Sequence, residues 1–173
     1  MHKPLVLAAV LGAIAVLAAG CGAASVEGFH AKTGGVAGAE HTLRAVTVKT
    51  AKVKGLGTIL VTSKGFVLYV FAPDKHRRVT CKRRCAAIWP PLKVSGKETA
   101  GGSAKKSLLG ADRNPSGGKV VTYAHWPLYT YIADSKPGEA SGQDIDLNGG
   151  YWYVIRPTGK VIKTKPKGMS HTY

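Results

Sequence analysis

The chain has 173 residues and carries 25 Lys and Arg against 9 Asp and Glu, a formal net charge of +16. That length allows one domain with a tether and is too short for two domains. The sequence contains no serine elbow, phosphate-binding loop or dinucleotide fingerprint, and its histidines lack the spacing of metal ligands. We therefore expect a protein that is not an enzyme, has no catalytic residues and uses no cofactor.

The N-terminal segment has the features of a bacterial export signal. A short positive start at Met1–Pro4 precedes an apolar run, Leu5–Ala19, that is short for a membrane-spanning helix. The run ends in Leu17-Ala-Ala-Gly-Cys21, which resembles the lipobox of bacterial lipoproteins. Residues 1–20 are therefore predicted to be a signal peptide, with lipid on Cys21 anchoring the protein to the membrane outside the cytoplasm. The alternative is an ordinary signal peptide followed by a chance cysteine.

Residues 21–44 are rich in Gly and Ala, and their hydrophobic residues do not recur with the spacing of a helix or a strand. They are therefore predicted to be a flexible tether. A coil of roughly 20 residues reaches on the order of 25 Å, which keeps the following domain near the membrane. Residues 45–173 are predicted to form that domain.

The domain has the pattern of short β-strands separated by turns. Strands are expected at 46–48, 58–62, 66–71, 119–123, 151–156 and 160–162, with a helical turn between Cys81 and Trp89 and an exposed excursion over 94–106. This predicts a mainly β fold: one compact antiparallel domain, either a sandwich or a small barrel. Two related units, at about 56–92 and 107–159, are expected to build it.

The relation between the units is a repeated pattern of Tyr, any residue, an aromatic, two residues and Asp. Its members are Tyr69, Phe71 and Asp74 in the first copy, and Tyr129, Tyr131 and Asp134 in the second. Residues two apart on a strand face the same side, so each copy presents two rings to one face. An aspartate just beyond a strand closes a turn. We interpret these as fold residues, with an aromatic ligand platform as the alternative.

This repeat, with Cys85-Ala-Ala-Ile-Trp-Pro-Pro-Leu92 and Gly150-Tyr-Trp-Tyr-Val154, resembles a family of bacterial secreted-repeat lipoproteins. That family is named for the motif and has no settled biochemical function. The resemblance covers roughly residues 56–159. It implies an envelope location and a repeat-built domain, and it supplies no catalytic residues.

Two cysteines remain if Cys21 is acylated. An even pair outside the cytoplasm usually forms a disulfide, and the spacing of Cys81 and Cys85 permits one. The alternative is an extracytoplasmic redox or electron-transfer role, since nearby cations lower a thiol pKa. The spacing is not Cys-x-x-Cys, however, which disfavours that role.

Basic residues cluster around these cysteines. Removing Lys3 with the signal leaves 24 basic against 9 acidic residues, a net charge of +15. An exported protein does not meet nucleic acid, so we expect its anionic partners to be lipid headgroups or wall polymers. The candidate binding residues, called the basic loop below, are Lys75, Arg77, Arg78, Lys82, Arg83 and Arg84.

A weaker candidate is a metal site. Asp144, Asp146 and Asn148 place oxygen ligands at alternate positions before a glycine, like the opening of a calcium loop. The position of the bidentate glutamate is occupied by Ile155, so an Asx-rich turn is the favoured interpretation and a calcium- or metal-dependent binding module the alternative.

Overall fold

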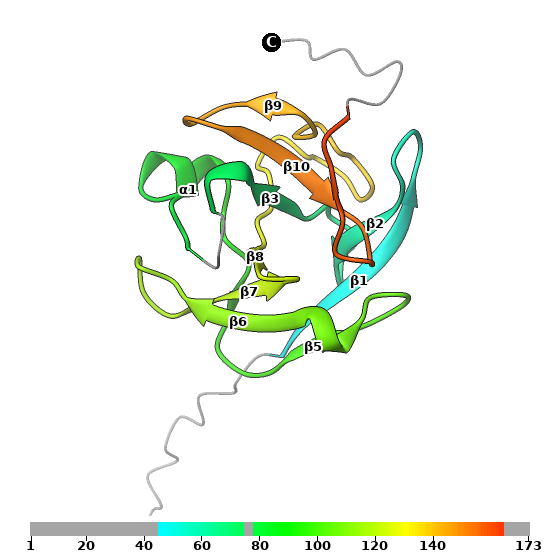
Figure 1. Ribbon diagram of the computed structural model, residues 1–173, viewed down its shortest axis with the longest axis horizontal. Coiled ribbons are helices and arrows are strands. Elements are labelled where there is room, and N and C mark those ends of the chain that lie inside the picture. Colours follow the sequence, from blue (N-terminus) through cyan, green and yellow to red (C-terminus); the bar gives the residue numbers. More distant parts are fainter. Residues whose placement is uncertain (1–44, 75–77, 165–173) are drawn as a thin grey trace, which may run out of the picture. The chain divides into compact units, whose positions relative to one another are not determined.

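The computed structural model describes residues 45–74 and 78–164, all within a unit that spans residues 40–173. The predicted signal peptide, Cys21, the tether, Lys75 and Arg77 lie outside the described residues. Within the described part, three small sheets and one short α-helix confirm the prediction of a mainly β domain (Figure 1). No helix in that part is long and apolar enough to cross a membrane.

The first sheet begins with a hairpin. Strand β1 (Val46–Val53) pairs antiparallel with β2 (Gly57–Thr62), and β5 (Glu98–Ala100) joins the other side of β1. Along β1, Val48 and Val53 lie five positions apart and are buried in different core clusters, while Lys49 and Lys52 are exposed.

The second sheet contains the strand of the first motif copy, and the third sheet contains the strand just before the second copy. The second consists of β3 (Tyr69–Phe71), β10 (Tyr151–Ile155), β11 (Val161–Ile162) and β9 (Ile145–Asp146). The third consists of β4 (Lys93–Val94), β7 (Lys119–Tyr123), β6 (Leu109–Arg113) and β8 (Trp126–Pro127). The helix α1 (Arg84–Ile88) and the 3₁₀ turns η1 (Ala72–Asp74) and η2 (Lys106–Leu108) complete the elements.

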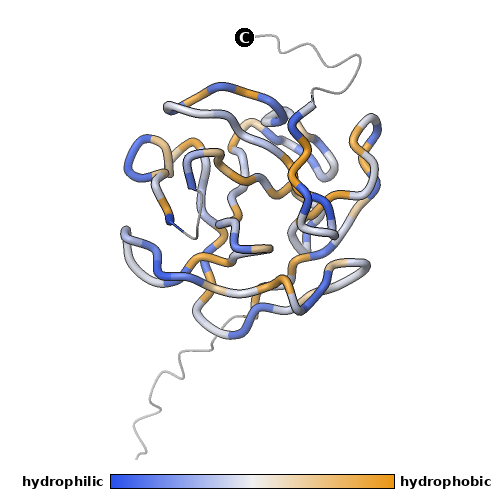
Figure 2. Tube along the Cα trace, viewed as in Figure 1, coloured by the Kyte–Doolittle hydropathy of each residue, from blue (hydrophilic) through white to orange (hydrophobic). Residues whose placement is uncertain are grey.

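Strand β3 is buried on both faces and divides the core into two clusters. Tyr69 and Phe71 face a cluster that contains the tryptophans Trp89 and Trp152. Val70 faces the second, aliphatic cluster. Hydrophobic residues gather along the central strands, and hydrophilic residues mark the outer loops, including the one that leads into α1 (Figure 2).

Two expectations need correction. Residues 94–106 were expected to be an exposed excursion, but they contain β5, which lies parallel to β1 in an otherwise antiparallel set of strand pairs. The backbone of Val46–Val48 needs partners on that side, and the hydroxyls of Thr47 and Thr99, 2.9 Å apart, join the strands. The strand expected at 66–71 covers only Tyr69–Phe71. Before Tyr69 the chain makes only an isolated antiparallel β-bridge, between Val67 and Val61.

Candidate functional site

The two copies of the motif meet at their first tyrosines. Tyr69 and Tyr129 form an antiparallel bridge in which each backbone N–H donates to the other residue's carbonyl oxygen, at 2.8 and 3.0 Å. Each hydroxyl then donates to the aspartate of the other copy: Tyr69 to Asp134 Oδ2 at 2.7 Å, and Tyr129 to Asp74 Oδ2. We call these the crossed pairs. Each repeat thus supplies the partner that the other repeat needs.

The second oxygen of each aspartate holds the loop that follows it. Asp74 Oδ1 accepts from the backbone N–H and the hydroxyl of Thr80, at 2.7 and 2.5 Å, and the backbone N–H of Cys81 also bonds this carboxyl. Asp134 Oδ1 accepts from the backbone N–H of Ser141 at 2.9 Å. Both carboxyls are buried. These contacts favour a structural role, and Asp74 fixes the start of the disulfide loop.

Four aromatic rings stack beside the crossed pairs. Trp89 and Trp152 lie face to face with centroids 3.9 Å apart and planes 4° apart. Tyr131 stacks on Trp89 at 4.0 Å, and Phe71 stacks on Trp152 at 4.3 Å. The second aromatic position of each motif therefore packs on the tryptophan of the other repeat, so the rings cross between repeats just as the hydrogen bonds do.

The tyrosines of the crossed pairs meet the same tryptophans at their edges. Tyr69 contacts Trp89 at 5.4 Å and Tyr129 contacts Trp152 at 5.2 Å, both in T-shaped geometry. Both tryptophans are 0% exposed. Trp152 Nε1 donates to Leu147 O at 3.0 Å, whereas Trp89 Nε1 has no partner among the described residues. With their faces covered by other rings, these side chains favour the core interpretation over a ligand platform.

Burial changes the acid–base behaviour of the crossed pairs. It raises the pKa of the Asp134 carboxyl to about 6, against hydrogen bonds from Tyr69 and Ser141 that lower it. Burial likewise raises the pKa of Asp74 above its usual value. The phenol pKa values of Tyr69 and Tyr129 rise because of burial and the neighbouring carboxylates. The tyrosines therefore remain hydrogen-bond donors.

The raised pKa of Asp134 predicts a protein that becomes more stable as the solution is acidified from neutral pH. Its folded pKa of about 6 lies above the value of about 3.9 for an unfolded aspartate. The folded state therefore binds this proton more tightly, so the contribution is complete below about pH 4 and is lost as pH rises through 6. Thermal unfolding between about pH 4 and pH 7 measures it. Asp134→Asn should flatten the profile, and a melting temperature that falls steadily on acidification would contradict it.

The two remaining cysteines form the predicted disulfide. Cys81 and Cys85 are joined with their Cα atoms 5.2 Å apart, one of them inside α1. They are only 2% and 9% exposed, so a thiol in solution has little access to the bond. This burial favours a structural bridge over the redox role.

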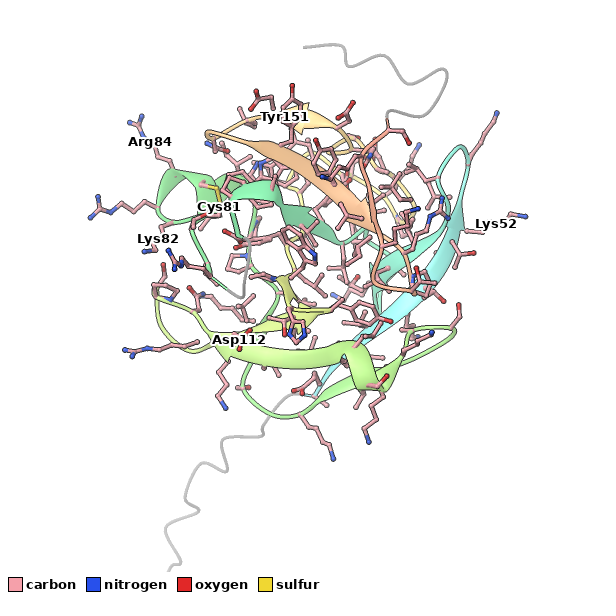
Figure 3. The ribbon with its side chains drawn as sticks, in the orientation of Figure 1. Lys52, Cys81, Lys82, Arg84, Asp112 and Tyr151 are labelled. Carbon is pink, nitrogen blue, oxygen red and sulfur yellow. A yellow bond between two sulfur atoms is a disulfide. The ribbon has the colours of Figure 1, made fainter. Side chains whose placement is uncertain are left out.

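The bridge presents the described part of the basic loop to solvent. Arg78, Lys82, Arg83 and Arg84 are all exposed. Figure 3 shows Lys82 and Arg84 extending away from the domain beside α1. Arg83 has φ 52° and ψ −117°, a backbone conformation that favours glycine. The chain therefore holds an arginine at a strained position between the two cysteines.

The acidic segment forms a strand and a turn. Asp146 lies on β9 opposite Tyr151, and Asp144 and Asn148 have positive φ values of 60° and 61°, as turn residues do. The described residues contain no group of three or more His, Cys, Asp and Glu side chains placed to hold a metal ion. The metal hypothesis thus gains no support from the geometry.

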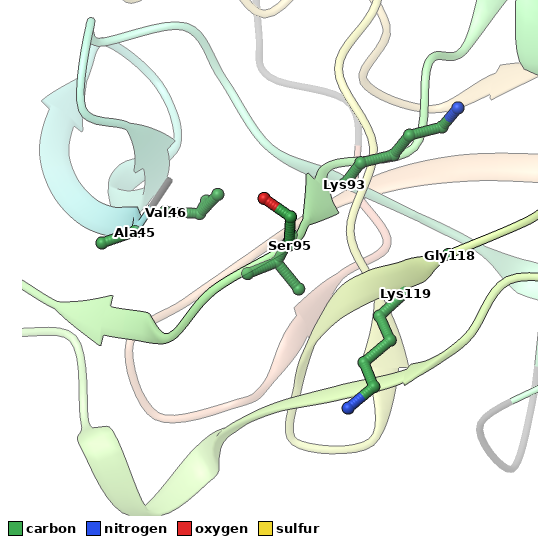
Figure 4. A pocket seen from close by; sticks show the side chains of 7 residues that line it. Ala45, Val46, Lys93, Ser95, Gly118 and Lys119 are labelled. Carbon is green, nitrogen blue, oxygen red and sulfur yellow. The ribbon is translucent and has the colours of Figure 1, made fainter. Parts of the chain in front are cut away.

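An open pocket of about 430 Å³ lies between the start of β1, the end of β4 and the start of β7. Its lining residues are Ala45, Val46, Lys93, Val94, Ser95, Gly118 and Lys119. Figure 4 shows the side chains of Lys93 and Lys119 pointing away from each other, so the two ammonium groups do not converge on one ligand. None of these residues was predicted from the sequence to be a site residue.

Comparison with known proteins agrees with the repeat architecture. Residues 50–93 and 110–156, more than half of the chain, match a family described as a secreted repeat of unknown function. Each matched segment contains one copy of the motif and the tryptophan that follows it. No curated protein and no solved structure matches the chain. The chain belongs to this secreted-repeat family, carries two of its repeats, and is accordingly an extracytoplasmic protein.

Proposed function

We propose that this protein is a lipoprotein, anchored through Cys21, whose domain binds anionic components of the cell envelope without catalysis. The observation that carries the proposal is the exposed basic loop. Among the described residues, none of its side chains at Arg78, Lys82, Arg83 and Arg84 has an ion pair with a carboxylate. Four exposed cations that have no carboxylate partner among the described residues favour an external polyanion.

The strained backbone of Arg83 supports the same proposal. A non-glycine residue in a sparsely populated conformation costs on the order of 1–3 kcal/mol, and the surrounding structure must impose it. Here the disulfide and the hydrogen bonds of Asp74 hold the loop in place. Glycine would relieve the strain but would remove the guanidinium. Such a conflict between local preference and structure is typical of functional positions.

The repeated motif has a different role in this proposal. We infer that the Tyr-x-aromatic-x-x-Asp pattern is what the two repeats of the family have in common, and that it joins them through the crossed pairs. The partner-binding residues then lie in the loop between motif and tryptophan, which differs between the repeats: only the first repeat carries the disulfide and the basic loop there.

Charge reversal tests the proposal with a matched control. Changing Arg78, Lys82, Arg83 and Arg84 to Glu should weaken adsorption of the unlipidated mature chain to anionic vesicles or wall material. At about 1 kcal/mol for each basic residue near an anionic surface, we expect a loss of about a thousandfold at low salt. The control changes four exposed lysines, Lys97, Lys105, Lys106 and Lys119, to Glu and alters the net charge equally. Equal losses in both variants would show that net charge acts diffusely and would refute a specific binding loop.

A further inference from the structure

We propose that the anionic component is a lipid bilayer, and that Ile132 inserts into it beside the basic loop. This inference rests on the proposed function and narrows it to one partner. Ile132 is 63% exposed, more than any other large hydrophobic side chain in the described part of the chain. It lies directly after Tyr131, the second aromatic residue of the motif in the second repeat.

The backbone places Ile132 against the helix that carries the basic residues. Its N–H donates to the carbonyl oxygen of Ile88, the last residue of α1, at 3.1 Å. The first residue of the helix is Arg84, and five residues at a rise of about 1.5 Å put the helix ends roughly 6 Å apart. An exposed isoleucine and exposed arginines therefore share one edge of the domain.

The surroundings of Ile132 extend this apolar edge. Ala87 and Ala133 are exposed, and Ile88 is half-buried. Tyr131 stacks on Trp89 at 4.0 Å, which fixes the backbone just before Ile132. The nearby carboxyl of Asp134 is buried and bonded to Tyr69, so it does not face a ligand at this surface. The carboxylate of Glu139, at the surface, accepts hydrogen bonds from Ser135 and interacts with the charge of Lys136, which offsets it. The edge thus combines a held aliphatic side chain with several cations.

This combination fits a bilayer better than a wall polymer. A sugar or phosphate polymer offers charge but no apolar phase, so the exposed aliphatic side chain would gain nothing from it. An anionic bilayer offers headgroup phosphates to the basic loop and acyl chains to Ile132, as for other interfacial proteins. Because the residue is already held by α1 and the ring stack, little ordering is needed on binding.

The other exposed hydrophobic residue lies in the opposite electrostatic setting. Tyr151, 45% exposed, stacks with Tyr153, and Asp146 lies across the strand pair from it. Asp144 acts electrostatically on Tyr153 as well. Anionic lipids would be repelled from these carboxylates. We therefore assign membrane contact to the edge formed by α1 and Ile132, and not to the face formed by β9 and β10.

The test compares one variant on two anionic partners. The mature, unlipidated chain is added to vesicles that contain phosphatidylglycerol, to phosphatidylcholine vesicles and to soluble polyphosphate. Ile132→Ser should lower affinity for the anionic vesicles about tenfold or more, the effect of losing a buried aliphatic side chain, and should leave polyphosphate binding unchanged. Tyr151→Ser, the matched control, should change neither. Thermal unfolding confirms that both variants are folded.

A second readout reports insertion directly. In a mature chain that also carries Cys21→Ser, a fluorophore on Ile132→Cys should be quenched by nitroxides in the acyl chains of anionic vesicles, and one on Lys119→Cys should not. Unchanged vesicle affinity in Ile132→Ser, or no quenching at position 132, would overturn the membrane inference. Binding to polyphosphate without binding to vesicles would also overturn it, and would leave the proposed function standing. Failure to bind either partner would overturn the proposed function as well.

Discussion

Replacing Trp152 with alanine should lower the free energy of unfolding by about 3–5 kcal/mol, the range for removing a large buried aromatic side chain. Trp152 is 0% exposed and is stacked between Trp89 and Phe71. It also contacts the edge of Tyr129 and donates from Nε1 to a backbone carbonyl. Alanine would leave a cavity bordered by rings from both repeats, and rigid rings collapse poorly into empty space.

The neighbouring residue on the same strand provides the control. Tyr151→Ala also removes an aromatic ring from β10, but this ring is 45% exposed and packs only on the surface against Tyr153, so the unfolding free energy should change by about 1 kcal/mol or less. Chemical denaturation of the three proteins gives both values. A Trp152→Ala variant within about 1 kcal/mol of the parent would contradict the role of the stack.

The stack has a consequence for cooperativity. The rings of Tyr131 and Phe71 each pack on the tryptophan of the other repeat, and the hydrogen bonds of the crossed pairs also run between repeats. Neither repeat contains its own complete set of core partners. The two repeats should therefore unfold together in one transition, although the sequence presents them as successive units.

Much of this architecture was predictable because it depends on local patterns. Alternation along 46–48 and 58–62 identified β-strands, and the turns at 63–65 and 157–159 are closed by hydrogen bonds at Gly65 and Gly159. The short helix after Cys81 was expected from the residues before Pro90, and the disulfide from an even pair of cysteines outside the cytoplasm whose spacing permits it. The repeated motif identified six residues, of which four form the crossed pairs and two enter the ring stack.

The rest could not be predicted because it depends on partners distant in sequence. Tyr69 and Asp74 recur with the same spacing as Tyr129 and Asp134, so bonding within one copy fits the sequence equally well. The bridge between Tyr69 and Tyr129 sets the two copies antiparallel and side by side, and in that arrangement each hydroxyl bonds the aspartate of the other copy. Strand β5 was missed because its three residues, flanked by glycines and lysines, are too few to show an alternation of apolar and polar side chains. Its partner strand β1 also lies some fifty residues earlier in the chain. The exposure of Ile132 could not be predicted, because an isoleucine directly after the aromatic positions of a motif strand would be expected to be buried.

Removing the carboxylate of Asp74 should have the second-largest effect, a loss of about 2–4 kcal/mol in unfolding free energy. Asp74→Ala leaves the hydroxyl of Tyr129 without an acceptor inside the core and frees the backbone N–H of Thr80. A buried donor left unsatisfied costs about 1–3 kcal/mol, and some of this is recovered near Thr80, which is exposed. Asp146→Ala, which removes an exposed carboxylate, should change stability by about 0.5 kcal/mol or less.

A double-mutant cycle tests whether the bonds cross between repeats. Tyr129→Phe combined with Asp74→Ala should show a coupling energy of about 0.5–3 kcal/mol, because the two side chains contact each other. Tyr69→Phe combined with Asp74→Ala pairs residues of the same copy, and their coupling should be close to zero because Tyr69 bonds Asp134 instead. The reverse cycle, with Tyr69 and Asp134, should again show coupling. Stronger coupling within a copy than between copies would mean that each repeat closes on itself, and the crossed arrangement would be wrong.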